Sequence, residues 1–134
     1  MRFDDWHERL TDAILAARDQ AFAYGVHDCF LMVADCALAI TGRDIAEGLR
    51  GRYETIEAGL KLGRVRSLAE KMRKHFKRVP LALAHRGDIA MAPVGVLRRG
   101  KREQILFVVD GVWLRGAGGM QVPRSEATHA WRVE

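Results

Sequence analysis

One run of thirteen residues constrains the fold of this chain more than any other feature. From Asp28 the sequence reads DCFLMVADCALAI, and the helix it predicts is apolar nearly all round, with Asp35 as its only internal charge. Asp28 is a typical N-cap residue, and Gly42 is a typical residue for ending a helix. A helix that is apolar on every side lies inside a core, so the rest of the chain has to surround it.

The segments on either side of this run also have helical patterns. Asp5 with Glu8 predicts a capping box that opens a first helix. The apolar residues of that helix share one face: Trp6, Leu10, Ala13, Ile14 and Ala17. A short helix is expected over residues 55–62. Ser67 with Glu70 predicts another capping box, which opens a helix that ends near Phe76.

After Pro80 the pattern changes to short apolar segments separated by turn residues. The segments at 89–92, 94–97, 103–109, 112–114, 120–122 and 131–133 predict strands. Asp110-Gly111 is a strong signal for a two-residue hairpin turn. Helices followed by an antiparallel sheet indicate an α+β fold, with the central buried helix packed on the C-terminal sheet. The length predicts a single domain over residues 1–134.

The cysteines and the N-terminus bear on the compartment. Cys29 and Cys36 are the only cysteines. Seven residues apart on one helix, they would be separated by about 10 Å, which is too far for a disulfide. Free thiols agree with a reducing compartment. The first apolar run, residues 13–17, is too short for a signal sequence or a membrane span. We therefore expect a protein made in the cytoplasm, with no membrane partner.

The net charge of +5 comes mainly from two basic clusters, residues 71–78 (KMRKHFKR) and 98–102 (RRGKR). They are interpreted either as solvated faces or as docking surfaces for an acidic protein partner, for anionic cell wall or for nucleic acid. No aromatic residues interleave with the second cluster, and the sequence has no helix-turn-helix or zinc-finger pattern. Nucleic acid is therefore not the expected main partner.

A cysteine at the start of a helix has two interpretations. The unpaired N–H groups and the positive end of the helix dipole stabilise a thiolate, which is the nucleophile of cysteine peptidases. Hydrolysis then needs a base within hydrogen-bond reach of the sulfur. Alternatively, Cys29 is a small buried apolar residue, which is the expected role of Cys36.

Several short motifs occur in an order that resembles a known group of proteins. They are Trp6, Tyr24-Gly25 with Asp28-Cys29, residues 50–55 (RGRYET), residues 86–88 (RGD) and the closing residues 130–133 (AWRV). The chain resembles short phage and prophage proteins found among tail genes, which in turn resemble NlpC-type, papain-like cysteine peptidases. The resemblance implies a papain-like NlpC-type fold, a place in the virion tail, and other tail subunits at the tip or hub as partners.

The chain departs from the NlpC pattern at the base. Residues 104–111 (QILFVVDG) fit the strand that follows the catalytic histidine, but Gln104 stands where the histidine belongs. Glutamine cannot take a proton from Cys29 near neutral pH. A third polar residue of that pattern would fall near Gly116 and is also missing. His129, and after it His27, are the candidates for a substitute base.

These observations leave more than one function open. The first is a structural or assembly protein of a phage-type tail, built on a degenerate cell-wall peptidase scaffold. The second is an active peptidase that cleaves peptidoglycan peptides during DNA entry, with Cys29 as nucleophile. The third is a binding module that grips peptidoglycan or a neighbouring subunit. No cofactor or metal is expected, because His27, Cys29 and one distant histidine fall short of the four ligands of structural zinc.

Overall fold

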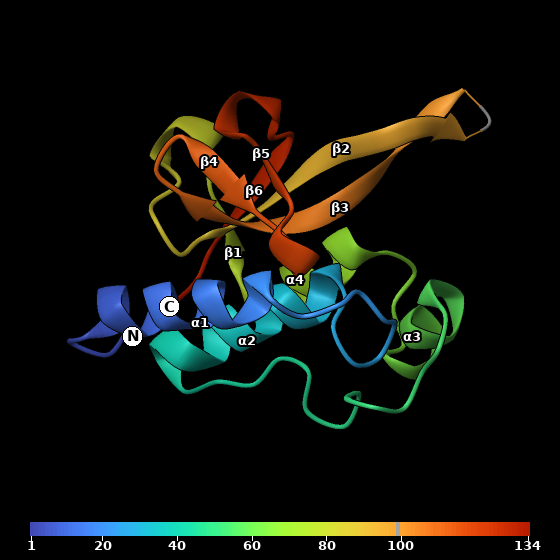
Figure 1. Cartoon of the computed structure of the whole chain (residues 1–134), viewed down its shortest axis with the longest axis horizontal. Helices are drawn as coiled ribbons and strands as arrows, with labels where there is room; N and C mark the ends of the chain where they lie inside the picture. Colours follow the sequence, from blue (N-terminus) through green and yellow to red (C-terminus); the bar gives the residue numbers. More distant parts are fainter. Residues whose placement is uncertain (99) are drawn as a thin grey trace.

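A computed structural model describes residues 1–98 and 100–134, and the side chains of residues 96–98 and 101 lie outside the description. In the described residues, four α-helices gather on one side of a six-stranded antiparallel sheet (Figure 1). The helices are α1 (Trp6–Arg18), α2 (Cys29–Thr41), α3 (Ile56–Leu62) and α4 (Leu68–His75). The strands are β1 (Lys77–Arg78), β2 (Ile89–Arg98), β3 (Lys101–Asp110), β4 (Trp113–Arg115), β5 (Gln121–Pro123) and β6 (His129–Arg132), in the spatial order β1-β6-β2-β3-β4-β5. The predicted α+β class is confirmed.

The apolar run forms α2 and lies in the core, as its composition requires. Nine of its thirteen residues are buried. The Asp28 carboxylate caps the helix by accepting the Leu31 N–H at 2.8 Å. Gly42 ends it in the left-handed conformation, with φ of 78°. The side chains of α2 pack against one face of the sheet, which contributes Met91, Leu106 and Trp131. The opposite face has its own apolar cluster around Phe107.

Two local predictions differ from the structure. The expected break at Pro93 does not occur, since β2 runs through it in one strand, with an irregularity between Val94 and Arg98. Backbone groups of Met91 face β6, and by strand alternation the nitrogen of Pro93 faces the same side, where β6 has already ended. The missing N–H is therefore not needed. Asp5 does not cap α1 with its side chain, because its carboxylate pairs with Arg9 Nε at 2.7 Å.

The β2–β3 hairpin extends beyond the rest of the sheet and projects past the helices (Figure 1). β6 pairs with β2 only as far as Met91, and β4 pairs with β3 only from Val108 onward. In the predicted basic cluster at 98–102, Arg98 is the last residue of β2 and Lys101 is the first residue of β3. Arg99 lies outside the described residues, and the only basic side chain of this cluster that the structure describes is Arg102, which is exposed.

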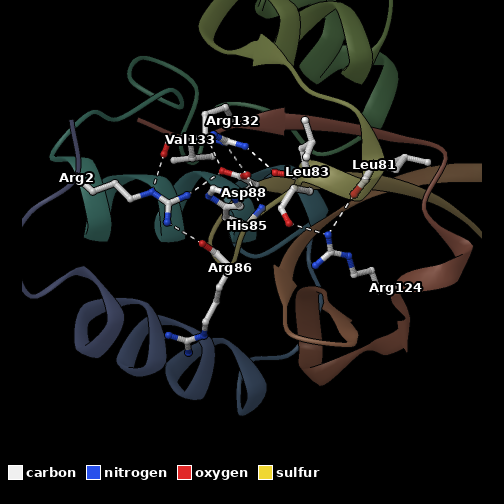
Figure 2. Close-up of polar contacts among 10 residues, drawn as sticks. Arg2, Leu81, Leu83, His85, Arg86, Asp88, Arg124, Arg132 and Val133 are labelled. Carbon is white, nitrogen blue, oxygen red and sulfur yellow. Dashed lines mark hydrogen bonds and ion pairs between the residues drawn. The ribbon is translucent and has the colours of Figure 1, made fainter.

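A buried carboxylate joins the two ends of the chain to the turn before β2 (Figure 2). Asp88 is fully buried. Its Oδ1 accepts from Arg2 Nη2 at 2.8 Å and from the Val133 N–H at 3.0 Å. Its Oδ2 accepts from Arg132 Nε at 2.9 Å and from the His85 N–H at 2.8 Å. Two of the sequence motifs, residues 86–88 and 130–133, are therefore parts of one structural site.

Among the described residues, no helix has both the length and the apolar character needed to cross a membrane.

Candidate functional site

Cys29 is the first residue of α2, and its position is fixed by the residue before it. Asp28 is buried, and besides capping Leu31 its Oδ2 accepts from the Gly25 N–H at 3.0 Å and from the Tyr53 hydroxyl at 2.5 Å. The motif around residues 24–29 and the motif at residues 50–55 therefore meet at one carboxylate. These motif residues hold the start of α2 in place and do not contact a reacting group.

Gly25 brings the two motif segments into direct contact. Its carbonyl accepts the Gly51 N–H at 2.7 Å, and its φ of 79° is in the left-handed region. A Cβ at this position would lie 2.1 Å from the carbonyl oxygen of Tyr53. Only glycine allows the backbone to approach this closely.

Replacing Tyr53 by phenylalanine is expected to lower the free energy of unfolding by about 1.5–3 kcal/mol, the usual worth of a hydrogen bond to a charged group. The ring stays in place, and only the donor to Asp28 Oδ2 is lost. Urea unfolding of the two proteins measures the difference. Equal unfolding midpoints would show that the bond contributes nothing to the helix start.

The thiol of Cys29 is not activated by its position at the helix start. Cys29 is only 9% exposed. Burial raises its pKa to about 11, and the negative charges of Asp28 and Glu103 act in the same direction. The backbone N–H groups of Leu106 and Phe30 favour the thiolate, but they are outweighed. The thiol is therefore protonated at neutral pH.

Alkylation of Cys29 by iodoacetamide should be slow and should accelerate by about tenfold per pH unit up to pH ~10, because only the thiolate reacts. Mass spectrometry of the Cys29 peptide measures the rate, and a free cysteine peptide, which levels off above a pKa of about 8.5, is the control. A plateau of the Cys29 rate below pH ~8 would contradict the raised pKa.

An open cleft of about 550 Å³ lies beside Cys29. Its walls come from α3, α4, the base of the β2–β3 hairpin and the segment before α2. Gln104 of β3 lines it together with Cys29. The remaining surface is mainly apolar and includes Ile56, Leu60, Leu68, Met91 and Ile105.

His129 is linked to Gln104 through a hydroxyl. Thr128 Oγ1 donates to Gln104 Oε1 at 3.0 Å and lies 2.9 Å from His129 Nδ1. The His129 ring stacks against Trp131 at 6.0 Å between centroids. Partial burial and the charge of Arg78 lower its pKa. Among the described residues that line the cleft, Gln104 is present and His129 is not.

The comparison with known families gives one match. A family model described as a domain of unknown function (DUF6950) matches residues 1–133. The chain belongs to the DUF6950 family. No curated protein and no solved structure matches it. The matched range includes the Asp28 and Asp88 networks and the cleft.

His27 of this DUF6950 chain is buried beneath the turn Ala117–Gly119. Its Nε2 accepts the Gly118 N–H at 2.9 Å, and its Nδ1 has no partner in the described part of the chain. The ring therefore holds the turn in place. The nearby Gly116, where a third polar residue was expected, packs on Phe107, since a Cβ there would lie 2.9 Å from the ring. The packing leaves no room for such a side chain.

Within the described residues of the DUF6950 chain, no group of three or more His, Cys, Asp or Glu side chains is placed to hold a metal. The cleft also has residues that the sequence did not single out. Arg66, before α4, and Glu103, on β3, both line it. No sequence signal marks them, because their proximity to Cys29 depends on how the α3–α4 segment folds back toward the hairpin.

Proposed function

We propose that this chain is a non-catalytic NlpC-like, papain-like domain that serves as a structural or assembly component of a phage-type tail, near its tip or hub. The observation that carries the proposal is the pairing in the cleft. Cys29 opens a buried helix as a peptidase nucleophile would, and Gln104 lines the same cleft at the position where the NlpC pattern has its histidine.

The chemistry of the cleft supports this proposal. Attack on a peptide carbonyl needs a thiolate and a group that accepts its proton. Burial keeps the pKa of Cys29 near 11, and the amide of Gln104 accepts no proton. The side chain of Gln104 is instead engaged with Thr128. Neither requirement for hydrolysis is met.

The motif residues also support a scaffold role. The motifs that resemble tail-gene proteins are used to hold the helix start through Asp28 and Tyr53, and to join the chain ends through Asp88 and Arg132. A domain that has the peptidase-like scaffold but no catalytic histidine is suited to holding neighbouring subunits. The tail assignment rests on the resemblance.

An active peptidase that cleaves peptidoglycan peptides is the second candidate, and one observation favours it. The cleft beside Cys29 is open, and the backbone N–H groups of Leu106 and Phe30 favour the thiolate. In this alternative His129 would have to leave Thr128 and Trp131 and enter the cleft as the base.

Deletion of the gene in a phage that carries it, followed by electron microscopy of the particles, tests the proposal. We expect defective or missing tails, and we expect full rescue by a Cys29→Ala copy, because the thiol has no chemical role. Normal tails after deletion would contradict a tail function. Failure of Cys29→Ala to rescue, with the variant folded, would favour the peptidase.

A further inference from the structure

The strand that borders the cleft has a free edge. The N–H of Val109 donates to the Asp88 carbonyl at 2.8 Å, and its carbonyl accepts the Gly87 N–H at 2.8 Å, so the backbone of Val109 faces the β2 side. Backbone groups alternate along a strand, so those of Leu106 and Gln104 point away from β2. β4 begins to pair only at Val108. The backbone groups of Leu106 and Gln104 therefore face no strand in the described part of the chain.

The cleft next to this edge has the character of a side-chain pocket. Its volume of about 550 Å³ and its mainly apolar walls are suited to an apolar side chain. Phe22 and Met120 at its rim are 53% and 42% exposed. The rings of Phe22 and Tyr24 meet edge to face at 5.0 Å. A free strand edge beside an apolar pocket is the arrangement that binds an extended peptide by strand addition.

The charges of the two chain segments that border the cleft indicate which kind of peptide would bind there. Residues 61–78 contain eight basic residues and one acidic residue, and residues 93–106 contain four and one. The remainder of the chain has ten basic and fifteen acidic residues, so the excess of positive over negative charge comes from these two segments. Arg66 of the first segment lines the cleft, and Arg102 of the second is exposed on β3.

Among the described residues, the basic side chains of 61–78 and that of Arg102 form no ion pair with an acidic side chain. Among the described residues that line the cleft, Glu103 of β3 is the one acidic side chain. Attraction between unlike charges therefore favours a partner segment that carries several carboxylates.

We propose that the cleft is the docking site for an extended acidic segment of a partner protein. The segment adds a strand to the β3 edge at Gln104, places an apolar side chain in the cleft, and directs carboxylates toward Arg66 and Arg102. This inference rests on the proposed assembly function and names the chemistry of the partner.

A fluorescent decapeptide of alternating glutamate and leucine is the probe, and fluorescence polarisation with the intact chain measures its binding. We expect Arg66→Glu to weaken binding at least tenfold and Glu103→Gln to strengthen it. Lys77→Glu is the matched control: it makes the same change of charge on β1, three strands away from β3, and should alter binding less than twofold. Equal losses in Arg66→Glu and Lys77→Glu would show only general attraction and would overturn the docking site.

The peptide backbone supplies a second test that does not depend on how a variant folds. Two peptides with the same sequence are N-methylated at alternate residues, in opposite phase. Strand addition uses every second N–H of the bound peptide, so one phase should abolish binding and the other should keep it. Equal binding by both phases would contradict strand addition. Stronger binding of a ten-nucleotide oligothymidylate or of an isolated wall stem peptide would assign the cleft to a different ligand.

The outcomes of these tests are separate from those of the tail experiment. If the decapeptide does not bind but deletion still removes tails, the docking site is wrong and the assembly function stands. If tails are normal after deletion, the assembly function is wrong whatever the decapeptide does.

Discussion

Replacing Asp88 by asparagine is expected to lower the free energy of unfolding by about 3–5 kcal/mol, the usual cost of removing one partner of a buried ion pair. The carboxylate is fully buried and accepts four hydrogen bonds, two of them from Arg2 and Arg132. The asparagine amide presents N–H groups where donors already converge, so both guanidinium groups lose their counter-charge. Urea unfolding measures the loss.

Asp35→Asn is the matched control for this prediction. Asp35 also pairs with an arginine, Arg50, at 2.7 Å, but both side chains are more than one-third exposed. The loss there should be below about 1 kcal/mol, because exposed ion pairs contribute little. Similar losses in the two variants would show that the buried network does not hold the chain ends together.

Replacing Gly25 by alanine is the second change with a large expected effect. We expect the free energy of unfolding to fall by at least about 3 kcal/mol, because the substitution combines backbone strain with a severe clash. The added Cβ would lie 2.1 Å from the Tyr53 carbonyl oxygen, which is backbone and cannot rotate away. The loop would have to separate from residues 50–55, and the Asp28 contacts would be lost with it. Thermal and urea unfolding both report the loss.

Gly48→Ala separates the clash from the backbone conformation. Gly48 has nearly the same φ, 78°, but nothing lies within 4 Å of the position of its Cβ. Only the left-handed conformation is penalised there, at about 1–2 kcal/mol. If Gly25→Ala costs no more than Gly48→Ala, the close approach to Tyr53 is not what requires glycine.

The helical half of the fold is predictable from the sequence because its signals are local. Asp28, Thr55 and Ser67 each accept an N–H from the first turn of the helix they cap, as their residue types indicate. Asp5 is the exception, since Arg9 one turn later competes for its carboxylate. Side-chain competition of this kind is not visible in a capping pattern alone.

The sheet is less predictable because its signals depend on neighbours. Pro93 would break a strand only if its N–H were needed, and the end of β6 decides that. β1 has two residues within a basic stretch, and it is a strand only because it pairs with β6. Neither feature can be inferred from residues near it in the sequence.

The candidate site is also only partly predictable from the sequence. The resemblance to the NlpC pattern implies that Cys29 and Gln104 belong to one site, and both line the cleft. The effect of the helix start on the thiol is local and favours the thiolate. Burial of the thiol depends on the tertiary structure, acts in the opposite direction and is the larger effect on the pKa of Cys29.

The most direct measurement of the central claim is a cell-wall digestion assay that compares the purified chain with Cys29→Ala, using an active NlpC-type peptidase on the same walls as the positive control. We predict that neither protein releases soluble wall peptides, because Cys29 stays protonated and Gln104 offers no base. Release of wall peptides by the natural chain, and not by Cys29→Ala, would contradict a non-catalytic role.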